Sequence, residues 1–336
     1  MGVFLVAVWQ NLALGQATPS ILEIDVANLV EYQQDISDVS KMATNPNVTT
    51  SAVGSVSGPH NFFVATVLGD IVAVNGQPVK GTYAARARAI ITNPAPAPGQ
   101  AIADTMPRAS IRETTFEILQ SDGTQIGAIM VFGVNGGPGS FPPGAPSLVT
   151  GAGSHAIVGG VGAFLGARGQ MGQRAIPQTV NARAASMAED PANRRTNGGG
   201  RVRYVLQVIP MFQPQIIATP SGWAVTHSSD YSLVSPSKPA AVGEILSLFA
   251  TGLGPTRPSL DPGQPFPTSP LAVVNSPVDV LVNGKPAEVL GAVGYPGALD
   301  GYQVNFRVPA DVAPGTVTLQ LSAAWITGSP VSIPVQ

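Results

Sequence analysis

The chain contains no cysteine among its 336 residues. This absence excludes a disulfide framework, a thiolate nucleophile and a zinc site built on thiolates. Charge is also scarce, because charged residues make up 11% of the sequence, and 17 lysines and arginines nearly balance 19 aspartates and glutamates. Such a composition offers no basic patch of the kind that binds nucleic acid or an anionic membrane. We therefore predict neither nucleic acid nor a membrane surface as a partner.

Residue patterns that hold metals or perform nucleophilic catalysis are missing as well. His60, His155 and His227 are widely separated and show no HxH or HExxH spacing, and the chain has no GxSxG elbow. His227 lies close to Asp230 in sequence, but proximity within a turn does not place a base beside a nucleophile. We interpret the histidines as surface or turn residues and predict no metal and no cofactor.

The segment Met1 to Ala17, MGVFLVAVWQNLALGQA, is apolar and ends in small side chains. Gly15 and Ala17 stand where a signal peptidase prefers small residues, which is typical of a secretory signal. An apolar first strand is the alternative, because no basic residue precedes Lys41. No other run approaches the ~20 apolar residues that span a bilayer. We expect a bacterial protein that is secreted or associated with the cell envelope, with no membrane span after processing.

What the chain has in abundance is glycine and proline, with 38 and 32 residues respectively. Together they exceed their share in average proteins and predict a structure rich in turns and poor in helix. The hydrophobic content of 44% and the length are sufficient for about two domains, each with its own core.

Short strands follow one another in the first two thirds of the sequence. An Asn75-Gly76 pair, typical of a hairpin turn, separates the apolar segment Asp70–Val74 from Thr82–Thr92. One face of Thr82–Thr92 carries alanines, which suits the inner side of a tight barrel. Further strands are predicted at Ile21–Val26, Phe62–Val67, Ile111–Gln120, Thr124–Val134, His155–Val158, Gly162–Gln170 and Val202–Ile209.

Two polar stretches interrupt these strands. The residues after Val26 allow a short helix around Tyr32–Met42. Residues 172–200 have glycine-rich ends and few apolar side chains, so we expect them to be mobile.

Gly160, Gly162 and Gly166 approach a dinucleotide-binding pattern, but they lie between two strands with no helix after them, which favours a hairpin turn in a crowded barrel wall.

The C-terminal third shows the clearest alternation of apolar and polar residues. Tyr302–Val308 and Val317–Leu321 alternate strictly, and Val278, Val280 and Val282 repeat the same period. A period of two predicts a half-buried antiparallel sheet. We therefore predict a small sandwich domain at this end of the chain.

Two resemblances to known families support this division. Val158–Met171, VGGVGAFLGARGQM, resembles the strand-turn-strand signature of the dirigent and allene oxide cyclase barrel superfamily, and Asp70–Tyr83 and Ile111–Val134 are similar to its central strands. This resemblance implies an eight-stranded antiparallel barrel, often oligomeric, with an apolar cavity at one mouth. The charged pattern that carries catalytic residues in the cyclases has no match at Ile21–Asp38.

Residues 238–336 resemble the uncharacterised C-terminal domain of secreted Acidobacteria proteins of the Solibacter type. The matching segments are GEILSLFATGLGPT (Gly243–Thr256), NGKPAEVLGAVGYPG (Asn283–Gly297) and YQVNFRVP (Tyr302–Pro309). That family has no known catalytic residues and implies secretion. The predicted fold is all-β: a β-barrel domain over 18–220, a linker over 221–237 and an immunoglobulin-like β-sandwich over 238–336.

The candidate site residues lie on strands of the predicted barrel. Glu113, Thr115 and Glu117 share one face of their strand, Arg112 and Phe116 share the other, and alternation cannot say which face is inside. Glu113 and Glu117 are the catalytic candidates, since a carboxylate in an apolar cavity could act as a general acid or base. The alternative is that they are solvated and pair with Arg86, Arg88 or Arg112 across the sheet. The candidate cavity residues are Tyr83, Arg112, Thr115 and Phe116.

The absence of a complete catalytic constellation favours a non-catalytic function. We expect a secreted binding or assembly protein, with protein partners or self-assembly through its sheets and a small apolar ligand as a further candidate partner. The alternative, which rests on the barrel resemblance, is a cyclase, isomerase or stereo-directing protein that acts on an apolar small molecule.

Overall fold

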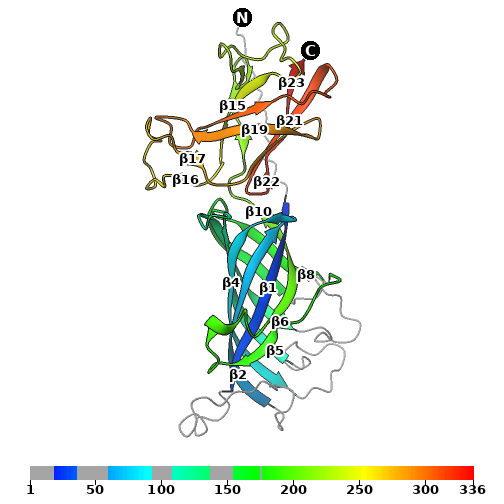
Figure 1. Cartoon of the computed structure of the whole chain (residues 1–336), viewed down its shortest axis with the longest axis vertical. Helices are drawn as coiled ribbons and strands as arrows, with labels where there is room; N and C mark the ends of the chain where they lie inside the picture. The colour runs from blue at the N-terminus through cyan, green and yellow to red at the C-terminus, as the bar shows by residue number, and fades with distance from the viewer. Residues whose placement is uncertain (1–18, 36–59, 93–107, 137–153, 175) are drawn as a thin grey trace, which may run out of the picture.

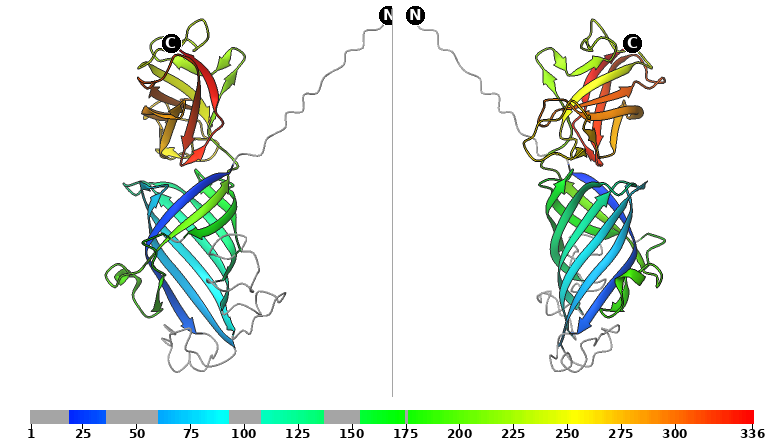
Figure 2. Two further views of the ribbon diagram at one scale, coloured as in Figure 1. Left: turned by 90° about the vertical axis from the view of Figure 1, so that its right-hand side faces the viewer. Right: turned by 60° about the vertical axis from the view of Figure 1, so that its left-hand side comes forward.

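The computed structural model describes residues 19–35, 60–92, 108–136, 154–174 and 176–336. These residues form β-strands, with no α-helix among them and a short 3₁₀ helix, η2 (Pro191–Asn193). The strands build two domains that lie end to end along the longest axis of the molecule (Figures 1 and 2). The predicted architecture of a barrel followed by a sandwich-like domain is confirmed.

The first domain is a closed antiparallel barrel. Each strand pairs with the next around the wall, and the last strand, β10, pairs with β1 to complete the closure. A closed barrel leaves no hydrogen-bonding edge within its wall. The strands, in their order around the wall, are β1 (Ser20–Asp35), β2 (His60–Val74), β4 (Lys80–Thr92), β5 (Arg108–Leu119), β6 (Gln125–Gly136), β7 (Ser154–Gly162), β8 (Arg168–Arg174) and β10 (Gly200–Ile209).

Two short strands supplement the wall. β3 (Gln77–Pro78) extends the turn after β2, where Asn75 and Gly76 both have positive φ, at 49° and 78°, as a tight hairpin turn requires. This is the turn that the Asn-Gly pair predicted. β9 (Arg183–Ser186) pairs in parallel with the second half of β1, beyond the point where β10 begins.

Inward side chains fill the half of the barrel that is nearer to the second domain. Burial of each such aliphatic side chain contributes roughly 1.5–3 kcal/mol. On β4, Ala85 and Ala87 face inward, as the alanine face predicted, while Arg86 is exposed. The largest aliphatic side chains of this core are Leu22, Ile24, Ile71, Ile118, Ile126, Ile129 and Ile157.

The turn between β7 and β8 explains the glycine pattern noted above. A Cβ atom on Gly160 would lie 2.1 Å from the carbonyl oxygen of Phe164, so only glycine fits where the turn folds back on the strand. Gly166 has a φ of 70° and completes the turn. The glycines therefore serve the hairpin, as predicted, and do not open a helix.

Residues 176–200 contact the barrel through charged side chains. Asp70 of β2 accepts hydrogen bonds from Arg194 (2.7 Å) and from Arg195 (2.8 and 2.9 Å). Arg183 pairs with Glu189 through two hydrogen bonds of 2.9 and 2.6 Å. Few apolar residues are needed for this attachment, which places the described residues of the excursion against the barrel wall.

The second domain is a curled sheet around its own core, which includes Leu246, Leu248, Val304, Phe306, Leu319 and Leu321. The predicted alternating strands are present as β18, β20 and β21. The strands are β11 (Gln215–Ile216), β12 (Ala218–Thr219), β13 (Gly222–Trp223), β14 (Val225–His227), β15 (Ile245–Thr251), β16 (Thr256–Arg257), β17 (Val273–Val274), β18 (Val278–Val282), β19 (Lys285–Gly294), β20 (Tyr302–Arg307), β21 (Gly315–Ala323), β22 (Ile326–Thr327) and β23 (Val331–Val335).

Part of the segment predicted as a linker belongs to this second sheet. β14 pairs antiparallel with β15, and Val225 stands opposite Leu248 with its side chain fully buried. Val234 is also part of the second core. Residues 221–237 therefore form an integral edge of the domain, because their apolar side chains complete its core.

The hairpin β21–β22 closes the end of the barrel on which the second domain sits. Ala324 and Trp325 form its turn, with positive φ of 48° and 62° that non-glycine residues seldom adopt. Trp325 is 8% exposed and packs into the barrel core together with Ala324 and Ile326. The second domain thus supplies the plug for one barrel mouth.

Polar contacts at the barrel rim hold this arrangement. The Asn275 side chain donates to the carbonyl of Gln125 (2.7 Å) and accepts from the hydroxyl of Thr124 (3.0 Å). Arg257 pairs with Asp122 in the β5–β6 turn at 2.5 Å. Because Asn275 is 2% exposed, its hydrogen bonds are shielded from water, whereas the Arg257–Asp122 pair is half exposed.

Candidate ligand site in the barrel interior

A bulge in β1 turns polar side chains into the barrel. Up to Val26, the even-numbered residues face inward, and β1 then contains one extra residue before Leu29 relative to both neighbouring strands. Asn28, within the bulge, has a φ of 50°. The parity therefore reverses, and Glu31 and Gln33 face the interior.

β5 and β7 bring further polar side chains to the same region. Arg112 and Thr114 face inward from β5, and His155 faces inward from β7. We call Glu31, Gln33, Arg112, Thr114 and His155 the polar cluster; each is less than 9% exposed. These residues lie near Asp35, Arg108 and Ser154, the strand ends that are remote from the second domain.

Small side chains alternate with the polar cluster around the wall. Ala87 stands directly opposite Arg112 on the neighbouring strand, and Gly133 stands opposite Arg112 on the other side. Alanine and glycine contribute little side-chain volume to this part of the interior. A row of inward residues runs around this part of the wall, and each residue stands opposite the next on the neighbouring strand. The row is Gln33, Ala65, Ala87, Arg112, Gly133 and His155.

An ion pair forms the centre of the polar cluster. Nη2 of Arg112 lies 3.5 Å from Oε2 of Glu31, and the side-chain amide of Gln33 donates to Oε1 of Glu31 at 2.9 Å. Burial by itself lowers the pKa of Arg112, but nearby Tyr83, Glu31 and Tyr204 more than offset it, so the pKa of Arg112 is raised. The guanidinium therefore stays charged although it is buried.

Aromatic rings lie next to the polar cluster. Tyr83 stacks on Tyr204 with ring centroids 5.0 Å apart, and Phe116 meets both rings edge to face at 5.2 and 5.4 Å. We call these three residues the aromatic floor. Burial raises the pKa of Tyr204 well above its ordinary value, so its hydroxyl stays protonated.

Several buried polar atoms of this region have no hydrogen-bond partner among the described residues. They are Oη of Tyr83, Oγ1 of Thr114, Nε of Arg112 and Oε1 of Gln33. The Tyr83 hydroxyl is near the Arg112 guanidinium and affects its pKa, but the geometry does not amount to a hydrogen bond. An unpaired buried polar atom costs about 1–3 kcal/mol, so such a group of atoms calls for a bound water or ligand.

The candidates predicted from the sequence divide between the two faces of the wall. Tyr83, Arg112 and Phe116 face the interior, where the structure brings them together. Thr115 is exposed on the outer face and so does not line the interior. Its assignment to a cavity is corrected by the register of β5.

Both catalytic candidates lie on that same outer face. Glu113 is exposed and pairs with Arg86 of β4 at 3.0 Å, which is the cross-strand alternative considered above. Glu117 is partly exposed beside it on the strand. Neither carboxylate is available to the interior, and the inward carboxylate is Glu31, which the bulge concealed from sequence reasoning.

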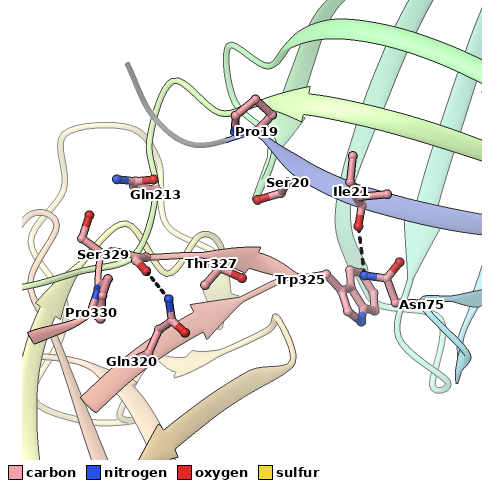
Figure 3. Close-up of a pocket in the computed structure, with 11 residues that line it drawn as sticks. Pro19, Ser20, Ile21, Asn75, Gln213, Gln320, Trp325, Thr327, Ser329 and Pro330 are labelled. Atoms are coloured by element: carbon pink, nitrogen blue, oxygen red, sulfur yellow. Dashed lines mark hydrogen bonds between the residues drawn. The ribbon is translucent and has the colours of Figure 1, made fainter. Parts of the chain in front are cut away.

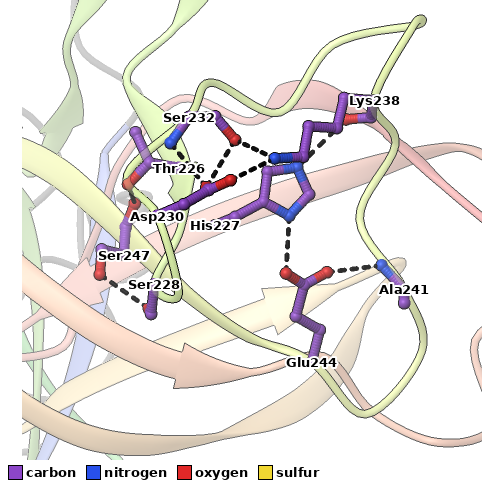
Figure 4. A network of polar contacts seen from close by, with 9 residues as sticks. All are labelled: Thr226, His227, Ser228, Asp230, Ser232, Lys238, Ala241, Glu244 and Ser247. Atoms are coloured by element: carbon purple, nitrogen blue, oxygen red, sulfur yellow. Dashed lines mark hydrogen bonds and ion pairs between the residues drawn. The ribbon is translucent and has the colours of Figure 1, made fainter.

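A histidine-centred network lies in the second domain (Figure 4). Nδ1 of His227 contacts Oε1 of Glu244 at 2.6 Å, and Nε2 contacts the carbonyl oxygen of Lys238 at 3.2 Å. Asp230 pairs with the Lys238 ammonium instead. His227 and His155 are each 4% exposed, which corrects their interpretation as surface residues. Both ring nitrogens of His227 are thus engaged by oxygen atoms of the same domain.

Two hollows follow the seam between the domains. One of about 350 Å³ lies beside Trp325 (Figure 3), and its lining carries no charged side chain. Asn75 and Gln320 in this lining already bond to the carbonyls of Ile21 and Gly328. The other, of about 390 Å³, includes Asp300. Each of these two amides therefore bonds within its own domain, on its own side of the seam.

Other kinds of site receive no support in the described part of the chain. Among those residues, no group of histidine, aspartate and glutamate side chains could hold a metal ion. The same residues contain no helix that is long and apolar enough to cross a membrane. The presumed signal segment, residues 1–17, lies outside the described residues, as do the side chains around His60.

Comparison with known proteins leaves the chain without a family. No protein-family model matches it, and no curated protein matches it. Among solved structures it is similar to a polysaccharide lyase, with 8% sequence identity and a TM-score of 0.17; the match covers 94% of this chain and 40% of the lyase. The chain thus spans less than half the length of that protein, and so low a TM-score carries no argument about function.

Proposed function

We propose that this protein is a non-catalytic binding protein that holds a small molecule inside its barrel, next to the polar cluster. The observation that carries this proposal is the group of buried polar atoms without partners, surrounded by small inward side chains. A barrel of this size can hold a single small ligand. The polar cluster also modifies our expectation of a purely apolar ligand, because an entirely apolar molecule would leave those atoms unpaired.

Native mass spectrometry of the purified protein tests this proposal. We expect a bound small molecule that is lost when the interior is filled by Ala85→Leu. The matched control is Ala84→Leu, because Ala84 is the neighbouring residue on the other face of β4 and is not buried. The proposal would be contradicted if the mass measured under native conditions equalled the mass measured under denaturing conditions, because no molecule would then be bound. It would also be contradicted if both variants retained the bound molecule equally.

Catalysis is the second candidate function. It is favoured by the position of Glu31, a carboxylate that is buried in the barrel interior beside Arg112, since such a group can act as a general acid or base. In a cyclase or isomerase, Glu31→Gln would abolish turnover of a bound molecule while leaving its binding intact. The binding function would be favoured if the unaltered protein showed no detectable turnover of the bound molecule and Glu31→Gln lost the binding itself.

The assembly part of the function is supported by the outer face of β5, β6 and β7. Ile111, Phe132 and Val158 are 56%, 47% and 46% exposed on three consecutive strands. Exposed apolar side chains on neighbouring strands are typical of protein contacts, and on this face the charged Glu113 stands directly opposite Phe132. Light scattering after size exclusion tests it: Phe132→Ser should dissociate a self-associated form, whereas Leu299→Ser, an exposed site in the second domain, should not.

Export completes the proposal. It is supported by the apolar start with small residues at Gly15 and Ala17, and by the resemblance of residues 238–336 to domains of secreted proteins. Expression of the whole chain in a bacterial host, followed by fractionation, should place a shortened protein outside the cytoplasm. Recovery of the chain in the cytoplasm with Met1 intact would contradict export.

A further inference from the structure

The charges of the polar cluster restrict what the barrel can hold. Arg112 and Glu31 are both about nine-tenths buried and form one neutral pair. A ligand carboxylate would place a second negative charge beside Glu31, and a ligand ammonium would place a second positive charge beside Arg112. Either charge would lose its hydration and would meet a like charge of the pair as well as an opposite one. The pair therefore favours an uncharged ligand.

The unpaired atoms define the complementary groups. Nε of Arg112 can only donate a hydrogen bond, and the hydroxyls of Thr114 and Tyr83 can donate or accept. Oε1 of Gln33 can only accept. A carbonyl or hydroxyl oxygen on the ligand would satisfy the donors, and a ligand hydroxyl could in addition donate to Gln33.

The surroundings define the remainder of the ligand. Phe116 and Tyr83 are fully buried, and their rings form the apolar surroundings of the polar cluster. Ala65 and Ala87 line the wall with methyl groups. A hydrocarbon ring or short chain can contact these surfaces while its polar end reaches Arg112.

From these observations we infer that the interior site recognises an uncharged molecule with an apolar ring or short chain and a carbonyl or hydroxyl oxygen directed at Arg112 and Thr114. This inference rests on the proposed function, because it specifies the ligand class of the same site. Bound water is the competing explanation for the unpaired atoms, since water could also satisfy them.

A set of probes on one carbon ring tests the ligand class with the full chain. The probes are cyclohexanone, cyclohexanol, cyclohexanecarboxylate and cyclohexylammonium, and binding is measured by titration of backbone amide shifts in NMR spectra. We expect the ketone and the alcohol to shift the amides of Ala85, Ala87 and Gly133, and to bind at least about tenfold more tightly than the charged probes, a difference of about 1.4 kcal/mol.

A matched pair of variants links the binding to the polar cluster. Thr114→Val removes an inward hydroxyl with little change of shape, and Thr115→Val makes the same change on the outer face. We expect Thr114→Val to weaken binding of the ketone and alcohol by about three- to tenfold and Thr115→Val to leave it unchanged. Thermal unfolding of both variants checks that the fold is retained.

The outcomes separate the two proposals. Tighter binding of a charged probe that is sensitive to Thr114→Val would overturn the inferred ligand class and leave the interior site standing. Equal effects of Thr114→Val and Thr115→Val would place the binding elsewhere and overturn the inference. If none of the probes shifts the interior amides, the inferred ligand class fails, while native mass spectrometry still decides whether the interior holds another molecule.

Discussion

The indole Nε1 of Trp325 donates a hydrogen bond of 2.8 Å to the side-chain oxygen of Gln77, and thereby joins a hairpin tip of the second domain to the rim of the barrel. The ring itself lies in the barrel core, where it is 8% exposed. The two domains therefore share one apolar core at their junction. Their stabilities are expected to be coupled.

Replacement of this ring should destabilise the barrel. We expect Trp325→Ala to lower the free energy of unfolding by about 3–5 kcal/mol, because it removes a buried aromatic side chain and leaves a cavity. Trp325→Phe should cost much less, since most of the volume remains. Urea unfolding followed by circular dichroism measures both. A cost for Trp325→Ala no larger than that of Leu299→Ala, at an exposed site, would contradict a shared core.

Loss of the Arg112 charge should be costly in a way that a second substitution relieves. Arg112→Met leaves the buried Glu31 carboxylate without the Arg112 guanidinium, and we expect a loss of about 3–5 kcal/mol in unfolding free energy. Adding Glu31→Gln removes the buried negative charge and should restore much of that loss. A double variant as unstable as the single variant would show that Glu31 and Arg112 are not energetically coupled.

Acid should release residues 176–200 from the barrel. Burial raises the pKa of Asp70, but hydrogen bonds from Arg195, Arg194 and Asn28 outweigh burial and hold the pKa of Asp70 well below its ordinary range. A carboxyl whose pKa is lower in the folded than in the unfolded state contributes stability above its unfolded pKa of about 3.9, and this contribution is lost as the pH falls below that value.

The substitution Asp70→Asn tests this dependence. We expect it to cost about 1–3 kcal/mol at neutral pH, with a difference from the unaltered protein that is constant above about pH 5 and shrinks below about pH 4. Limited trypsin digestion at neutral pH should cleave after Arg194 or Arg195 faster in this variant. Asp261→Asn, at an exposed position, serves as the control. A pH-independent difference would contradict the assignment to Asp70.

The contacts between the domains should differ in strength according to their exposure. Asn275→Ala removes shielded hydrogen bonds to Gln125 and Thr124, and we expect it to cost about 1–3 kcal/mol. Hydrogen bonds from Thr124 lower the pKa of Asp122 to about 2, and its partner Arg257 adds to that shift, yet the pair is half exposed. Asp122→Asn should therefore change the stability very little. Calorimetry on both variants would contradict this order if Asp122→Asn proved the more damaging.

Much of the fold could be predicted from local sequence patterns. The alternation at Tyr302–Arg307 and the Asn75-Gly76 turn each determine a strand or turn by short-range physics, and both appear in the structure. The alanine face of β4 identified its inward side correctly. These features were predictable because each depends on residues that are neighbours in the sequence and that favour a single backbone geometry.

The site was harder to predict, because its position depends on register. On β5, Arg112 and Glu113 are equally plausible inward residues until the pairing with Ala87 of β4 is known. Residues 176–200 and the plug by Trp325 depend on contacts between segments far apart in the chain. The φ of 62° at Trp325 is a conformation that a propensity argument would not assign to tryptophan.

The extra residue of β1 near Asn28 decides which side chains face the barrel interior. The side chains beyond it are Val30 and Tyr32 on one face and Glu31 and Gln33 on the other. Deleting one residue here would reverse which side chains of the following segment face inward. Val30 and Tyr32 would then face the interior, and Glu31 and Gln33 would face outward. Deletion of one codon would therefore replace a polar lining of this part of the interior by a hydrophobic one.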